Sequence, residues 1–117
     1  MPVNLEIHRR EKEDIVILDL KGRLIVGEPA TRLRETINKE AAAGCNKIIL
    51  NLEEVDYIDS TGLGELVSGY RLVKSEGGEI KLLNLNKKVT DLLQITKLYT
   101  VFDIHNQEAQ AVSSFHS

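Results

Sequence analysis

The sequence predicts a single α/β domain with a mixed, mostly parallel sheet, an N-terminal β-hairpin and about four helices. Its 117 residues leave room for one domain. Short apolar runs of strand length alternate with apolar residues at helical spacing, and strands separated by helices need crossover connections, which make them parallel. Two strand patterns with no helix between them open the chain, and they add one antiparallel pair to the sheet.

The first two elements are interpreted as a hairpin. Residues 3–8 alternate apolar and polar side chains, as a strand with one solvent-exposed face does. Residues 14–20 are rich in β-branched side chains and form the second strand, which Lys21 and Gly22 end. The charged run from His8 to Asp14 between them predicts a solvated turn.

A helix and a buried strand follow a loop over residues 23–29. The helix ends at Gly44, and its apolar stripe consists of Ala30, Leu33, Ile37 and Ala41. Residues 47–52 form a nearly continuous apolar run, which is typical of a strand covered on both faces. Cys45 precedes this strand and is interpreted as a small, partly buried filler; as the single cysteine of the sequence it excludes an intrachain disulfide.

The second half of the chain continues the alternation. A second helix ends at Gly77 and Gly78, and its core-facing stripe comprises Leu63, Leu66, Val67, Tyr70 and Val73. Gly69 on this helix predicts a tight contact with a neighbour. Residues 80–85 and 101–104 are expected to be strands, with a short third helix between them that contains Val89, Leu92 and Leu93. The fourth helix has Ala111, Val112 and Phe115 as its apolar stripe and Asp103 or Asn106 as its N-cap.

Charge and motifs exclude several function classes. The 15 basic and 18 acidic residues are interspersed, so the sequence offers no footprint for nucleic acid or an anionic membrane. Apolar runs stay far below the ~20 residues of a spanning helix, and we expect a cytoplasmic protein without direct membrane insertion. His8, His105 and His116 lack metal-ligand spacing and are expected to be solvated, so no metal site is predicted. Without an acid–base constellation, a P-loop or a hydrolase nucleophile motif, neither an enzyme nor a cofactor is expected.

The segment Asp59-Ser60-Thr61-Gly62-Leu63-Gly64 lies between a strand and the second helix. A small hydroxyl residue there is normally an N-cap, so Ser60 is expected to cap the helix. Each glycine costs roughly 0.5–1 kcal/mol against alanine in a helix, which predicts close approach of another backbone, from this protein or from a partner. The free amides of a helix start also tolerate a phosphate on Ser60, which would add about −1.5 to −2 charges.

Together with residues 50–58, this segment resembles the signature of STAS domains and, more narrowly, of bacterial anti-sigma factor antagonists. Residues 20–24, Gly77-Gly78 and residues 89–93 fit the same family, and the likeness implies one STAS domain over residues 1–117. The resemblance implies that Ser60 is the phosphoacceptor, with Thr61 as a weaker alternative. It also implies a set of partner-binding residues: Asp59, Thr61, Gly62, Leu63, Gly64, Arg23 and Ile25.

The resemblance further implies a switch without catalytic activity. The unmodified protein would bind an anti-sigma factor that is also a serine kinase with a GHKL-type ATP site, and would thereby release a sigma factor. Phosphorylation of Ser60 would separate the complex, and a PP2C-type phosphatase would reset it. Ile25 stands where many family members carry an acidic residue, which indicates a different partner specificity.

An alternative within the same family stays open. The chain could be a STAS scaffold or accessory subunit, in a stressosome-like assembly or as a partner of a lipid-transport ATPase, with Ser60 as a contact or capping residue. The sequence leaves the oligomeric state undetermined.

Overall fold

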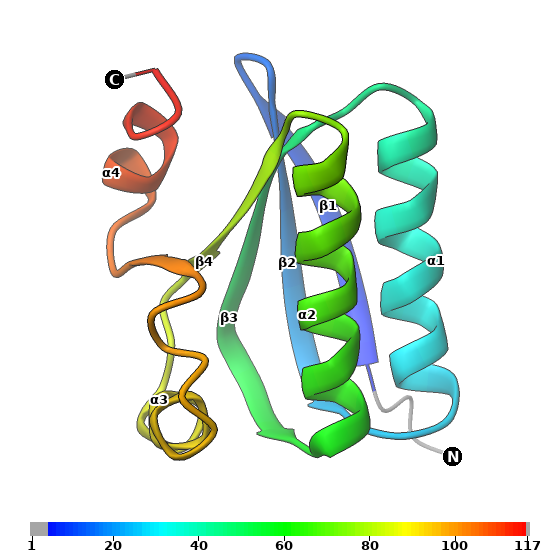
Figure 1. Ribbon diagram of the computed structural model, residues 1–117, viewed down its shortest axis with the longest axis vertical. Coiled ribbons are helices and arrows are strands. Elements are labelled where there is room, and N and C mark those ends of the chain that lie inside the picture. Colours follow the sequence, from blue (N-terminus) through cyan, green and yellow to red (C-terminus); the bar gives the residue numbers. More distant parts are fainter. Residues whose placement is uncertain (1–4, 117) are drawn as a thin grey trace.

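A computed structural model of the protein describes residues 5–116, which form a five-stranded sheet with helices on both faces (Figure 1). The strand order is β1-β2-β3-β4-β5; β1 is antiparallel to β2, and the other neighbours are parallel. The elements are β1 Leu5–Lys12, β2 Ile15–Leu24, α1 Glu28–Ala42, β3 Lys47–Ile58, α2 Ser60–Ser75, β4 Glu79–Leu83, α3 Lys87–Ile95, β5 Asp103–His105 and α4 Glu108–Ser113. The predicted mixed sheet with an opening hairpin and four helices is confirmed. Residues 3 and 4 of the predicted first strand lie outside the described residues.

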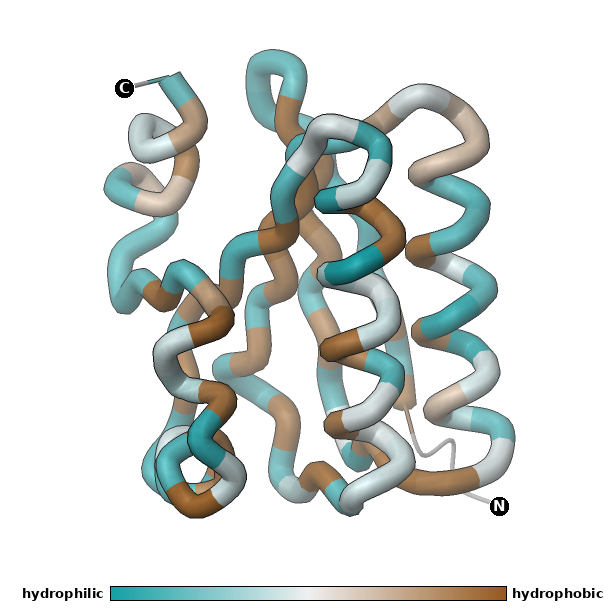
Figure 2. Tube along the Cα trace, viewed as in Figure 1, coloured by the Kyte–Doolittle hydropathy of each residue, from teal (hydrophilic) through white to brown (hydrophobic). Residues whose placement is uncertain are grey.

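Two apolar clusters lie on the two faces of the sheet. Successive side chains of a strand point to opposite faces, so Val16 and Leu18 of β2 join the larger cluster under α1 and α2, whereas Ile15 and Ile17 join the smaller one under α4. Figure 2 shows the apolar side of α2 turned toward the sheet. β3 divides in the same way, which confirms the prediction of a strand covered on both faces over its apolar run.

The charged run near the start is mostly strand, and its interpretation as a turn was wrong. β1 continues to Lys12, and only Glu13 and Asp14 connect the two strands. The reason is that the charges of β1 have partners in the fold. Arg10 Nε donates to Asp19 Oδ2 of β2 at 2.6 Å, and its Nη2 reaches Glu108 Oε1 of α4 at 2.9 Å.

β2 and β3 are both longer than the sequence predicted. β2 passes through Gly22, which adopts φ 113° within an irregular part of the ladder, and ends at Leu24. β3 runs beyond its apolar stretch to Ile58, which pairs with Leu24. Because the two strands are parallel and end together, the loop of residues 25–27 (the β2–α1 loop) lies beside the start of α2. The predicted loop over residues 23–29 is thus only three residues long.

The last elements of the chain also differ from those predicted. β4 ends at Leu83 and β5 begins only at Asp103. Neither proposed residue caps α4: its N-cap is Gln107, which makes no side-chain capping bond. Asp103 instead accepts a hydrogen bond from Lys81, and His105 Nε2 lies 3.0 Å from the same carboxylate oxygen. The His105 side chain is only 17% exposed, so the expectation that it is solvated was wrong.

Other predictions for the interior are confirmed. Cys45 is partly buried. On α2, Leu63, Leu66 and Val73 are buried. A Cβ on Gly69 would lie 2.7 Å from Ile37 Cδ1, so this glycine marks close packing of α2 on α1. Within residues 5–116, each helix is either too short or too polar to cross a membrane.

Candidate functional site

Ser60 is the first residue of α2 and is exposed at the end of the molecule where α1 also begins. The N-cap of α2 is Asp59 and not Ser60, so the capping role predicted for Ser60 was wrong. Asp59 has extended backbone angles, φ −97° and ψ −177°, and its Oδ1 accepts a hydrogen bond from the Gly62 amide at 2.8 Å. A carboxylate one residue earlier thus performs the capping, and the Ser60 hydroxyl is not used for it.

The second carboxylate oxygen of Asp59 reaches a different element. Asp59 Oδ2 accepts a hydrogen bond from the Val26 amide at 2.9 Å, and the Asp59 amide donates to Leu24 O at 3.3 Å. Backbone hydrogen bonds, first that from Gly62, hold the pKa of Asp59 below its ordinary value. The side chain is therefore an anion at neutral pH, and it joins the start of α2 to the β2–α1 loop.

The two glycines of the first turn have different surroundings. Gly62 is buried, and a Cβ at this position would overlap the Leu24 carbonyl oxygen. The predicted close approach of another backbone is thus confirmed for Gly62, and that backbone belongs to β2 of the same chain. Gly64 is exposed, and a Cβ there would meet no atom within 4 Å. For Gly64, the fold itself supplies no steric reason.

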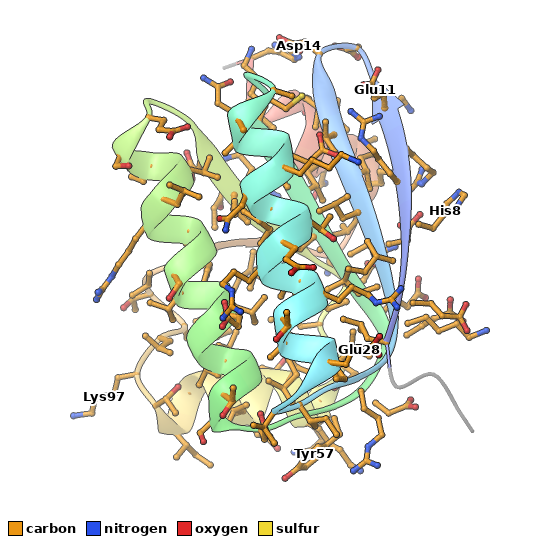
Figure 3. The ribbon with its side chains drawn as sticks, turned by 90° about the vertical axis from the view of Figure 1, so that its right-hand side faces the viewer. His8, Glu11, Asp14, Glu28, Tyr57 and Lys97 are labelled. Atoms are coloured by element: carbon orange, nitrogen blue, oxygen red, sulfur yellow. The ribbon has the colours of Figure 1, made fainter. Side chains whose placement is uncertain are left out.

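Aromatic and aliphatic side chains surround this end of the molecule. Tyr57 is 47% exposed, and the Arg23 guanidinium lies 5.7 Å from its ring centroid, within the range of a cation–π contact. Figure 3 shows Tyr57 at the same end as Glu28, the first residue of α1. In the β2–α1 loop, Ile25 is half-buried, whereas Val26 is 64% exposed.

A groove of 330 Å³ runs beside the end of β3. It lies between this strand end and α3, and its lining is more apolar than polar. The residues that line it are Tyr57, Ile58, Lys88, Val89, Asp91, Leu92 and Ile95. Ile95, one of these lining residues, is 79% exposed.

Some of the site residues predicted from the sequence are exposed on the surface, and others are buried beneath it. Ser60, Arg23, Thr61 and Gly64 are exposed, and Asp59 and Ile25 are half-buried. Gly62 and Leu63 are buried, so they shape the site from beneath. All of them belong to the end of β2, the β2–α1 loop or the start of α2, which lie side by side because β2 and β3 end together.

Sequence reasoning missed the exposed apolar residues Tyr57 and Ile95. Hydrophobic periodicity predicts helices and strands, but it does not show which of two apolar residues near the end of an element stays exposed. Their exposure is a property of the assembled fold. We call the exposed set Val26, Tyr57, Ser60, Thr61 and Ile95 the docking surface.

Comparison with known proteins gives concordant results. The family model of the STAS domain matches residues 6–111. The anti-sigma-B factor antagonist of Bacillus subtilis is 34% identical over 102 residues, which cover 87% of this chain and 92% of that protein. The anti-sigma F factor antagonist of Paenibacillus polymyxa is 27% identical over 95% of each chain.

A solved structure agrees over nearly the whole length. The crystal structure of TM1081 from Thermotoga maritima superimposes with a TM-score of 0.89 at 29% identity, covering 95% of each chain. The matched family model spans the start of α2 and nearly the whole sheet. The chain therefore belongs to the STAS domain family and, within it, to the bacterial anti-sigma factor antagonists.

Proposed function

We propose that this protein is a phosphorylation-gated antagonist of an anti-sigma factor. The unphosphorylated form binds an anti-sigma factor that is also a GHKL-type serine kinase, and a sigma factor is released as a result. Phosphorylation of Ser60 ends the binding. The observation that carries this proposal is the exposure of Ser60 at the first position of α2, with capping left to Asp59. The antagonist relatives support the class of partner.

In the phosphoryl transfer this chain supplies the nucleophile, and the kinase supplies the bound ATP and the general base. Ser60 Oγ attacks the γ-phosphorus of ATP, the new O–P bond forms, and the bond between the γ-phosphorus and the bridging oxygen breaks. ADP leaves with that oxygen, and the hydroxyl proton passes to a base of the kinase. A PP2C-type phosphatase restores the hydroxyl by hydrolysis of the phosphate ester. ATP and sigma factors place this cycle in the cytoplasm.

The charge added by the phosphate accounts for the loss of binding. Phosphorylation brings about −1.5 to −2 charges to a residue that adjoins the ionised Asp59. Glu65, on the second turn of α2, is paired with Arg34 of α1 at 3.1 Å, so that arginine is already engaged. Weakening a complex from nanomolar to micromolar takes about 4 kcal/mol. A dianion buried at an interface beside a second anion can supply this through desolvation and repulsion.

The apolar part of the docking surface supports a protein partner. Val26, Tyr57 and Ile95 are among the most exposed large hydrophobic side chains of the described residues. Aromatic and aliphatic side chains at the centre of an interface, with charged groups at its edge, are typical of sites where proteins bind. Lys88 and Asp91 provide such an edge beside the groove.

Phosphorylation by a cognate kinase tests the proposal. With kinase and ATP, intact-mass measurement should show one added phosphate on the wild type and none on Ser60→Ala. Ser68→Ala is the matched control, because Ser68 is an exposed serine further along α2 and its loss should leave the phosphate in place. Full phosphorylation of Ser60→Ala would contradict the site. Self-assembly into a large particle, or capture of a transporter ATPase regardless of ATP, would instead favour the scaffold role.

A further inference from the structure

We propose that Asp59 couples phosphorylation of Ser60 to the position of the β2–α1 loop; this rests on the phosphorylation proposed above. The two oxygens of Asp59 accept hydrogen bonds from amides of two elements, Gly62 of α2 at 2.8 Å and Val26 of the loop at 2.9 Å. These two amides are far apart in the sequence. The carboxylate therefore bridges α2 and the loop, and loss of its hydrogen bond to Gly62 disturbs its hydrogen bond to Val26.

The neighbouring N-cap shows why an ionised aspartate is needed at this position. Asn86 caps α3 by accepting a hydrogen bond from the Val89 amide at 2.9 Å, and its Nδ2 donates to Val55 O at 2.6 Å. Its second partner is a carbonyl, so an amide side chain serves both contacts. At Asp59 both partners are N–H donors, and an asparagine could satisfy only one of them. The second backbone N–H would face the NH₂ group of the asparagine, which is itself a donor.

The β2–α1 loop is anchored to α1 by separate bonds. Ile25 O accepts from the Ala30 amide at 3.1 Å, and Gly27 O accepts from the Thr31 amide at 3.1 Å. Neither bond reaches α2. The contact from Asp59 to the Val26 amide therefore fixes the middle of the loop, and with it the exposed Val26 side chain, relative to Ser60.

A phosphate on Ser60 competes with Asp59 for the same amides. It brings three acceptor oxygens to the first turn of α2, where the N–H groups point outward and carry partial positive charge. It also places a dianion one residue from the Asp59 carboxylate. Both effects weaken the hold of Asp59 on Gly62 and displace its second oxygen from Val26. Phosphorylation thus removes Val26 from the docking surface, in addition to repelling the partner directly.

Amide exchange measured by NMR tests this coupling without a kinase. Phosphoserine is installed at position 60 of the full chain by codon suppression, and the exchange rate of the Val26 amide is compared with that of the unmodified protein. We expect about tenfold faster exchange of Val26, the effect of losing a hydrogen bond to a charged acceptor. Asp59→Asn without phosphate should accelerate the exchange of the Val26 or the Gly62 amide by a similar factor, because the single amide oxygen can accept from only one of them.

The Val89 amide is the internal control, because its Asn86 cap lies on another helix and should keep its exchange rate in every sample. If Val26 exchange is unchanged in the phosphoserine protein, the coupling is refuted, even where a kinase does phosphorylate Ser60. If a kinase fails to modify Ser60 but installed phosphoserine accelerates Val26 exchange, the coupling stands and the proposed function falls.

Discussion

Gly62 and Gly64 stand two residues apart on α2 and differ in what surrounds them. A side chain at Gly62 would overlap the Leu24 carbonyl oxygen, whereas at Gly64 it would enter open space. Backbone atoms cannot move aside as the end of a flexible side chain can. The requirement for glycine at position 62 is therefore steric and internal, whereas the fold supplies no steric reason for glycine at position 64.

Alanine substitutions separate the two roles. Gly62→Ala should lower the free energy of unfolding by about 1–3 kcal/mol through overpacking. Gly64→Ala should leave it unchanged or raise it by up to about 1 kcal/mol, because alanine favours the helix. Urea unfolding followed by circular dichroism measures both. Equal stabilities of the two variants would contradict the contact with Leu24.

At the scale of the element, β1 shows how charged residues become part of a sheet. Arg10 is bound by Asp19 of β2 and Glu108 of α4, and these hydrogen bonds hold the pKa of both carboxyl groups below their ordinary values. The carboxylates are thus more easily ionised in the folded than in the unfolded protein. Their contribution to stability is present above the unfolded pKa values, near 4, and is lost as the pH falls through the lower folded values.

Arg10→Gln tests this linkage. At pH 7 we expect the variant to be less stable than the wild type by about 1 kcal/mol, since the groups are partly exposed. This difference in the free energy of unfolding should shrink as the pH is lowered from about 5 toward 2. Over that range the carboxylates of the wild type become protonated and lose their ion pairs with Arg10. Urea unfolding over this pH range measures it. Arg71→Gln, at an exposed position of α2, should show no comparable pH-dependent difference.

At the scale of the whole molecule, the buried core and the proposed docking surface consist of different residues. Ile17 is fully buried in the cluster under α4, and Ile95 is exposed on the docking surface. Ile17→Ala should cost about 2–5 kcal/mol of unfolding free energy through the cavity that it leaves. It should leave the dissociation constant for the kinase unchanged, provided that the variant is measured below its unfolding transition.

Ile95→Ala should have the opposite effect. An exposed side chain contributes little to stability, so the free energy of unfolding should stay within about 0.5 kcal/mol of the wild type. Loss of a central apolar contact should weaken kinase binding by at least about fivefold, or about 1 kcal/mol. Isothermal titration calorimetry compares the two variants. If Ile95→Ala binds as the wild type does, Ile95 lies outside the interface.

The sequence by itself determined the order of strands and helices and the position of Ser60 at a helix start. Both follow from local signals: the spacing of apolar residues, the glycines that end helices and the short polar segment before α2. The resemblance of that segment to the STAS signature depends on the same few adjacent residues.

Only the tertiary structure decided which groups meet. Asp59 and Val26 are 33 residues apart, and Arg10 and Glu108 are 98 apart. The exposure of Ile95 likewise depends on where α3 lies. Such contacts are set by strand order and register, which bring distant segments together. Local patterns therefore placed Ser60 at a helix start, whereas packing assigned the cap to Asp59, closed the space at Gly62 and left Val26, Tyr57 and Ile95 exposed.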